Sequence, residues 1–152
     1  MLRSWGRNSW SLEIEYEINE FYSLSISRDL LAIGTTSNVK LCDLKSRAFI
    51  ASYPYPCALF LTFSPDCTRL AGAGGVSLRL WDVPSLMASL PYKDQYVPVL
   101  VLAFSPDCSR LASGSMDGTV MLWDTCRPCQ QIATQKRHSG KIRALSFSPD
   151  GV

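Results

Sequence analysis

The tetrapeptide Phe-Ser-Pro-Asp occurs three times in this 152-residue chain, and this repetition limits the possible folds more than any other feature. The copies begin at Phe63, Phe104 and Phe147, so they are separated by 41 and 43 residues. A fixed period of about 20 to 50 residues indicates a repeat architecture, in which each unit buries its apolar surface against the next. We therefore expect stacked copies of one unit of about 40 residues.

Two further markers recur with the same period. The first is a Trp-Asp pair preceded by Leu, and the second is a short Leu-Ala segment that lies between the tetrapeptide and the pair. The pairs are Trp81-Asp82 and Trp123-Asp124, with a weaker copy at Cys42-Asp43. A period of about 40 to 45 residues that contains a Trp-Asp pair is typical of four-stranded propeller blades.

With these markers, the sequence resembles the WD-repeat family over residues 20–152. The fullest match is residues 102–124, which read LAFSPDCSRLASGSMDGTVMLWD and depart from the family pattern chiefly at Cys108, where Gly usually stands. The resemblance implies an all-β fold of four-stranded antiparallel blades. It also implies that a set of residues is structural in each repeat. These residues are Trp81, Asp82, Ser113, Asp117, Trp123 and Asp124.

The residues support this fold without the family name. Residues 99–104 are a continuous apolar run that ends in a Ser-Pro-Asp turn, which favours a strand buried on both faces. Asp117-Gly118 lies between two apolar segments and predicts a hairpin, because Gly accepts the positive φ of a tight turn. In residues 119–123, apolar side chains alternate to both faces, so the sheet is expected to be covered on both sides.

The markers divide the chain into an N-terminal segment and a series of blades. Residues 1–19 contain an apolar and acidic alternation at 12–18, the pattern of an exposed edge strand. Blades are expected at residues 21–53, 57–90 and 97–134, with a partial blade at 141–152. Closed propellers have about 4 to 8 blades, so an open or incomplete ring is expected. The alternatives are part of a longer protein, closure by self-association through exposed blade edges, and a truncated fragment.

Charge and apolar patterning exclude several classes of protein. The net charge is only +2 and no long Lys/Arg block occurs, so nucleic acid is not an expected partner. The longest apolar run has eight residues, 97–104, which is too short to span a membrane. The first ten residues contain no export signal, so the six cysteines are interpreted as thiols and the protein is expected to be cytoplasmic.

Two motifs are candidates for chemistry. Cys126 and Cys129 have the spacing of a zinc or redox pair, but a tetrahedral zinc site needs further ligands and the sequence has no second Cys pair. A turn between strands explains them better, and the chain is expected to hold no zinc and no cofactor. His138 is the only histidine and no Gly-x-Ser-x-Gly motif occurs, so a catalytic triad is not expected. In the family, His138 would be a structural residue of a Gly-His loop.

The sequence therefore predicts a protein-interaction scaffold, part of a longer signalling or assembly protein, and not an enzyme. An enzymatic propeller is the alternative, but it would need converging carboxylates or metal ligands, and the thirteen acidic residues do not cluster in this way. A fragment without independent activity is a third possibility. The partners are expected to be other proteins, which would bind the face that carries the hairpin turns. The residues predicted to contact them are Tyr96, Met116, Lys141 and Arg143.

Overall fold

The computed structural model describes residues 2–4, 12–14, 21–55, 57–83, 87–88, 97–126 and 130–151. In these ranges the chain contains strands and no helix, and the strands form three four-stranded antiparallel sheets and one two-stranded sheet. The small sheet pairs β1 (Leu2–Ser4) with β2 (Leu12–Ile14). The expected all-β fold of four-stranded antiparallel units is confirmed.

Each large sheet is built of four strands that are consecutive in the chain and adjacent in space. Blade 1 consists of β3 (Phe21–Ser27), β4 (Leu30–Thr35), β5 (Asn38–Asp43) and β6 (Ala48–Pro54). Blade 2 consists of β7 (Phe60–Phe63), β8 (Arg69–Gly74), β9 (Ser77–Asp82) and β10 (Met87–Ala88). Blade 3 consists of β11 (Val99–Phe104), β12 (Arg110–Ser115), β13 (Thr119–Asp124) and β14 (Gln131–Lys136).

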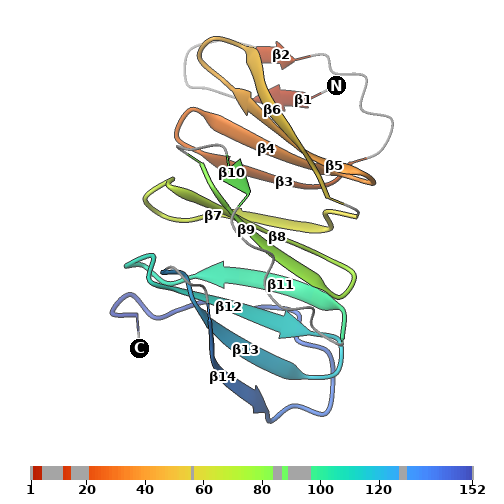
Figure 1. Ribbon diagram of the computed structural model, residues 1–152, viewed down its shortest axis with the longest axis vertical. Coiled ribbons are helices and arrows are strands. Elements are labelled where there is room, and N and C mark those ends of the chain that lie inside the picture. The colour runs from red at the N-terminus through yellow and green to blue at the C-terminus, as the bar shows by residue number, and fades with distance from the viewer. Residues whose placement is uncertain are drawn as a thin grey trace.

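The three blades are stacked in chain order (Figure 1). The first strand of blade 2, β7, contacts the first strands of both neighbours, β3 and β11. The stack is open in the described part of the chain, and no sheet closes on itself. Each blade has two apolar faces, so stacking gives blade 2 a covered surface on both sides, which a single sheet could not have.

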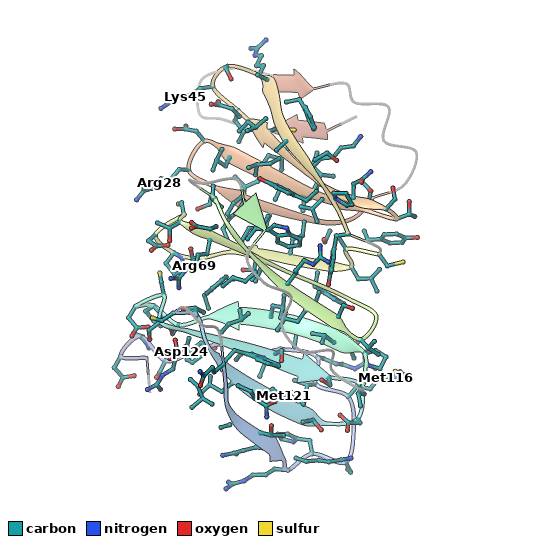
Figure 2. All side chains as sticks on the ribbon, viewed as in Figure 1. Arg28, Lys45, Arg69, Met116, Met121 and Asp124 are labelled. Carbon is teal, nitrogen blue, oxygen red and sulfur yellow. The ribbon has the colours of Figure 1, made fainter. Side chains whose placement is uncertain are left out.

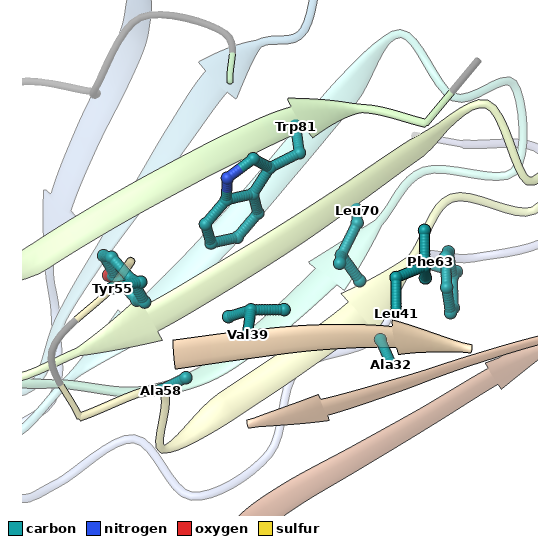
Figure 3. Close-up of a cluster of buried hydrophobic side chains, with 8 residues drawn as sticks. All are labelled: Ala32, Val39, Leu41, Tyr55, Ala58, Phe63, Leu70 and Trp81. Carbon is teal, nitrogen blue, oxygen red and sulfur yellow. The ribbon is translucent and has the colours of Figure 1, made fainter. Parts of the chain in front are cut away.

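Two interfaces between the blades contain most of the buried apolar side chains. Between blades 1 and 2, Trp81 is 1% exposed and packs edge-on against Tyr55, with the ring centroids 5.3 Å apart (Figure 3). Between blades 2 and 3, Trp123 is 2% exposed and packs with Leu78 and Leu80 of blade 2. Blade 2 is therefore covered on both faces, whereas in blade 3, for which this was expected, Val120 and Leu122 of β13 are only half-buried.

The joint between successive blades has the same construction each time. At each joint, a buried residue at the beginning of the next unit donates its backbone N–H to the hairpin end of the blade before. Of the three donors, only Val99 is the first residue of a strand. The donors and acceptors are Ala58 N to Thr35 O at 3.2 Å, Val99 N to Gly75 O at 3.1 Å, and Ile142 N to Ser115 O at 3.1 Å. A Cβ on Gly114 would lie 2.4 Å from Ile142 Cγ2, so the small residue in β12 allows the next segment to approach closely.

Residues 141–148 occupy the position of a first strand without forming one. Ile142 fills the same place as Ala58 and Val99, and the following turn reaches Pro106, whose Cδ is 3.8 Å from a Cβ built on Gly151. The segment was expected to be the first strand of a partial blade, but the structure contains no strand there. A strand is defined by its ladder of hydrogen bonds, and no described segment forms a ladder with these residues.

The Ser-Pro-Asp turns recur because each turn satisfies its own polar groups. Ser105 Oγ donates to Asp107 Oδ1 at 2.5 Å and accepts from the backbone N–H of Arg110 at 2.9 Å. The backbone N–H of Ser109 also donates to Asp107 Oδ1, at 3.1 Å. The hydroxyls of Ser105 and Ser109 lower the pKa of Asp107 to about 2, because they stabilise its charged form. Ser and Asp are therefore required together in this turn.

The residue after each Ser-Pro-Asp has a positive φ, which explains why the family prefers Gly there. The φ angles are 63° at Cys67, 62° at Cys108 and 77° at Gly151. We expect Cys108→Gly to raise the free energy of unfolding by about 0.5 to 1 kcal/mol, because it removes left-handed strain but increases the entropy of the unfolded chain. Urea denaturation would measure the change.

Cys108→Ala is the matched control for this prediction, since it removes the thiol and keeps the strain. We expect Cys108→Ala to leave the stability within about 0.5 kcal/mol of the original. If Ala and Gly raised the free energy of unfolding equally, the thiol of Cys108, and not its backbone conformation, would be the source of the destabilisation.

Candidate functional site

One edge of the stack, here called the hairpin rim, collects the turns between second and third strands together with the segments that lead into first strands. Because the strands alternate in direction, these turns and segments meet at the same end of each blade. Hydrogen bonds tie them together: Met116 N donates to Pro98 O at 2.9 Å, and Tyr55 N donates to Ser37 O at 3.0 Å. In Figure 2, Met116 lies on this edge, and Arg28 and Arg69 mark the opposite edge.

The structure places three of the four predicted contact residues at or beside this rim. Met116 stands on the hairpin turn between β12 and β13 and is 43% exposed. Lys141 and Arg143 are exposed on both sides of the seated Ile142. The hydrogen bond from Ile142 to Ser115 brings their segment next to the turn that carries Met116. Tyr96 lies outside the described residues.

A hollow of about 360 Å³ lies beside Lys141 and Arg143. The residues that line it include the apolar Val120, Ile142 and Leu145 and the two cations. The complete set of lining residues is Val120, His138, Ser139, Gly140, Lys141, Ile142, Arg143, Ala144 and Leu145. The hollow therefore combines apolar surface with positive charge.

The stretch of sequence that contains Lys141 and Arg143 has charges of one sign. Residues 125–149 contain five Lys/Arg and no Asp or Glu. Lys136 is paired with Asp117, with Nζ and Oδ2 3.2 Å apart. A hydrogen bond from the Thr119 side chain, with smaller effects of Lys136, keeps the pKa of Asp117 below its usual value. Within the described residues Lys141 and Arg143 make no ion pair.

Two features of the rim were not predicted from the sequence. Val76, in the two-residue turn between β8 and β9, is 41% exposed and is a second exposed apolar side chain on a hairpin turn of the rim. The signal in the sequence is the Gly74-Gly75 pair before Val76, and Gly75 has the positive φ of 55° of a tight turn. The second feature is the contact of His138 with Gly118: a Cβ on Gly118 would lie 2.1 Å from His138 O. The backbone of His138, not its exposed side chain, makes this contact.

In blade 3, three of the structural residues expected from the repeat pattern make two separate hydrogen bonds. Trp123 Nε1 donates to Ser113 Oγ at 2.9 Å, and Asp117 Oδ1 accepts from the backbone N–H of Thr119 at 3.0 Å. In blade 2 the indole N–H of Trp81 has no partner, because Gly72 stands where Ser113 stands in blade 3. A Cβ on Gly72 would lie 2.6 Å from Trp81 Cζ3, so the Trp81 ring occupies the space of the missing side chain.

The described residues contain no group of three or more His, Cys, Asp or Glu side chains placed to bind a metal ion. Cys126 is exposed in the connection between β13 and β14, and Cys129 lies outside the described residues. None of the described segments is a helix long and apolar enough to cross a membrane.

The fold and the repeated joints define stacked blades of the β-propeller class. The family model described as WD domain, G-beta repeat, matches residues 89–124 and 129–152. The WD-repeat resemblance recognised in the sequence is therefore confirmed for these residues. The crystal structure of the computationally designed Ika4 protein is similar, with a TM-score of 0.77 and 17% identity over 89% of this chain and 83% of that chain. This likeness concerns the fold alone. A search of curated proteins found no match.

Proposed function

We propose that this chain is a protein-interaction scaffold and that its partner docks on the hairpin rim around Met116. WD40 repeats and the propeller fold support a scaffold in general. We choose this face because two apolar side chains, Met116 and Val76, are exposed on its hairpin turns. The rim also has two cations, Lys141 and Arg143, that form no ion pair with the described residues.

The physical properties of the rim suit a docking surface. An apolar side chain gains most when a partner covers it, and the flexible Met116 side chain adapts its shape to that partner. Lys141 and Arg143 would attract a partner with acidic residues and orient it before contact. Backbone hydrogen bonds at each blade joint hold the rim in place. Binding therefore costs little conformational entropy of the backbone.

The more specific form of this proposal is a binding module of a longer signalling or assembly protein in the cytoplasm. We propose binding, rather than catalysis, as its activity. Self-association is a separate form of the same proposal, in which the partner is a second copy that covers the exposed blade edges. Sedimentation of the purified chain distinguishes this form, because its apparent mass would rise with concentration.

An interaction screen with the full-length protein, followed by calorimetry with each partner found, tests the proposed face. We expect Met116→Ala and Arg143→Ala each to weaken binding about tenfold, because each removes a contact worth about 1 to 2 kcal/mol. Lys141→Ala should mainly slow association and reduce its dependence on salt. Tyr96→Ala belongs to the same set, because Tyr96 was predicted as a contact.

Ile132→Ala is the matched control, since Ile132 is 52% exposed but lies on the outer strand β14. This change should leave binding unaltered. If binding instead survives all four rim changes while thermal stability is unaffected, the contact face lies elsewhere on the molecule.

A further inference from the structure

We propose that Ser139 is a phosphorylation site for a protein kinase that selects basic residues before the acceptor serine. The proposal rests on the exposure of the segment 137–141, which joins β14 to the seated Ile142, and on the charges that precede Ser139. It does not depend on the proposed docking face.

The serine is accessible in the folded protein. Every residue from 137 to 141 is exposed, and none of them belongs to a strand. The Ser139 hydroxyl makes no hydrogen bond to the described residues. A Cβ built on the neighbouring Gly140 would meet no atom within 4 Å, so there is open space directly beside Ser139. A bound kinase therefore has room to reach the acceptor oxygen.

The segment is also held in place, which fixes where the serine is presented. The carbonyl oxygens of His138 and Gly140 lie against Gly118, where an added Cβ would approach to 2.1 and 2.9 Å. On the far side, the N–H of Ile142 donates to Ser115. Because these contacts use backbone atoms, the side chains of the segment remain free for recognition.

The charge pattern before Ser139 is unique in this chain. Lys136 and Arg137 stand three and two residues before it, and no other Ser or Thr has basic residues at both positions. Kinases choose substrates by such charge patterns, which match acidic residues in their substrate groove. Lys136 is engaged by Asp117, but an exposed ion pair of this kind is weak and a kinase carboxylate can replace it.

Two other serines have a basic residue three positions before them, and burial excludes one of them as a kinase substrate. Ser113 has Arg110 three residues before it but is 0% exposed and hydrogen-bonded to Trp123. Ser146 follows Arg143 by three residues and is exposed, but it has Ala144 at the second basic position. Ser146 is therefore the natural control for Ser139.

In the reaction, Ser139 Oγ forms a bond to the γ-phosphorus of a nucleoside triphosphate. The bond from that phosphorus to the bridging oxygen breaks, the hydroxyl proton goes to the kinase base, and nucleoside diphosphate leaves. The product carries a charge of about −1.5 to −2 at neutral pH. Arg137, Lys141 and Arg143 lie within four positions in sequence, so the phosphate would neutralise most of the positive charge around the hollow.

The test incubates the folded chain with ATP and the catalytic subunit of cyclic-AMP-dependent protein kinase, and maps phosphate by mass spectrometry. We expect phosphate at Ser139, approaching one per chain. Ser139→Ala and Arg137→Ala should each lower incorporation at least tenfold. Ser146→Ala should leave it unchanged, and circular dichroism should show all variants to be folded.

A peptide of residues 132–145 provides the second arm, because it presents the same charges without the fold. Phosphorylation of the peptide but not of the folded chain would overturn the proposal, since the loop would then be inaccessible. Absence of phosphate from both would overturn it as well, because the charge pattern would not be recognised. Phosphate that persists in Ser139→Ala would place the site elsewhere.

Discussion

Replacing Trp123 with alanine is expected to lower the free energy of unfolding by about 3 to 5 kcal/mol, the range for truncation of a buried aromatic residue. Trp123 is 2% exposed at the interface between blades 2 and 3, where its ring packs with Leu78 and Leu80. Its indole N–H also donates to Ser113 Oγ at 2.9 Å. The alanine variant would therefore leave a cavity between two blades and remove this hydrogen bond to Ser113. Denaturation by urea, followed by circular dichroism, measures the loss.

Trp123→Phe separates the two contributions. Phenylalanine keeps much of the apolar ring but has no N–H, so the expected cost is smaller, about 1 to 3 kcal/mol. A loss below about 1 kcal/mol for Trp123→Ala would mean that the interface does not hold the blades together. The indole N–H of Trp81 is buried and has no hydrogen-bond partner among the described residues. We therefore expect Trp81→Phe to lower the free energy of unfolding less than Trp123→Phe does.

The sequence predicted the blades well because their strands carry strong local signals. Asp117-Gly118 marks the hairpin between β12 and β13, and Gly118 has the positive φ of 85° that such a turn needs. The apolar run before Ser105 became β11, although only Val99 is fully buried and the other five residues are half-buried, so the expected burial on both faces is not reached. These features depend only on residues close together in the chain, so periodicity and turn chemistry are sufficient to find them.

Interactions between blades could not be predicted in this way. Tyr55 lies in a connecting segment, yet it is 1% exposed and its hydroxyl donates to Ser77 O at 2.7 Å. Nothing in its neighbours in sequence indicates burial, because the residues that cover it come from blade 2. The different surroundings of Trp81 and Trp123 were not predicted either. They arise because the neighbouring strand has Ser113 beside Trp123 in blade 3 and Gly72 at the equivalent position in blade 2.

For the candidate site, the sequence identified the exposed turn and the nearby cations but not their packing. Met116, Lys141 and Arg143 were chosen from the repeat pattern, and the structure exposes all three. The contact between the His138 backbone and Gly118 needed coordinates, because it joins a hairpin in blade 3 to the segment that follows the blade. This contact fixes the position of the segment on the rim.

Replacing Gly118 with alanine is expected to destabilise the protein by about 2 to 5 kcal/mol, from two independent causes. The φ of 85° costs a residue with a Cβ about 1 to 2 kcal/mol. The new Cβ would also lie 2.1 Å from His138 O and 2.9 Å from Gly140 O, so the rim segment would have to move, at a cost of about 1 to 3 kcal/mol. Urea denaturation measures the sum.

Gly75→Ala is the control that separates strain from collision. Gly75 also has a positive φ, 55°, but a Cβ there would meet no atom within 4 Å. We expect this variant to lose only about 1 kcal/mol, the cost of the backbone conformation alone. The difference between the two variants then measures how firmly residues 138–140 are packed on the turn. If Gly118→Ala cost no more than Gly75→Ala, the segment would be loosely held, and the hairpin rim would not present Lys141 and Arg143 at fixed positions.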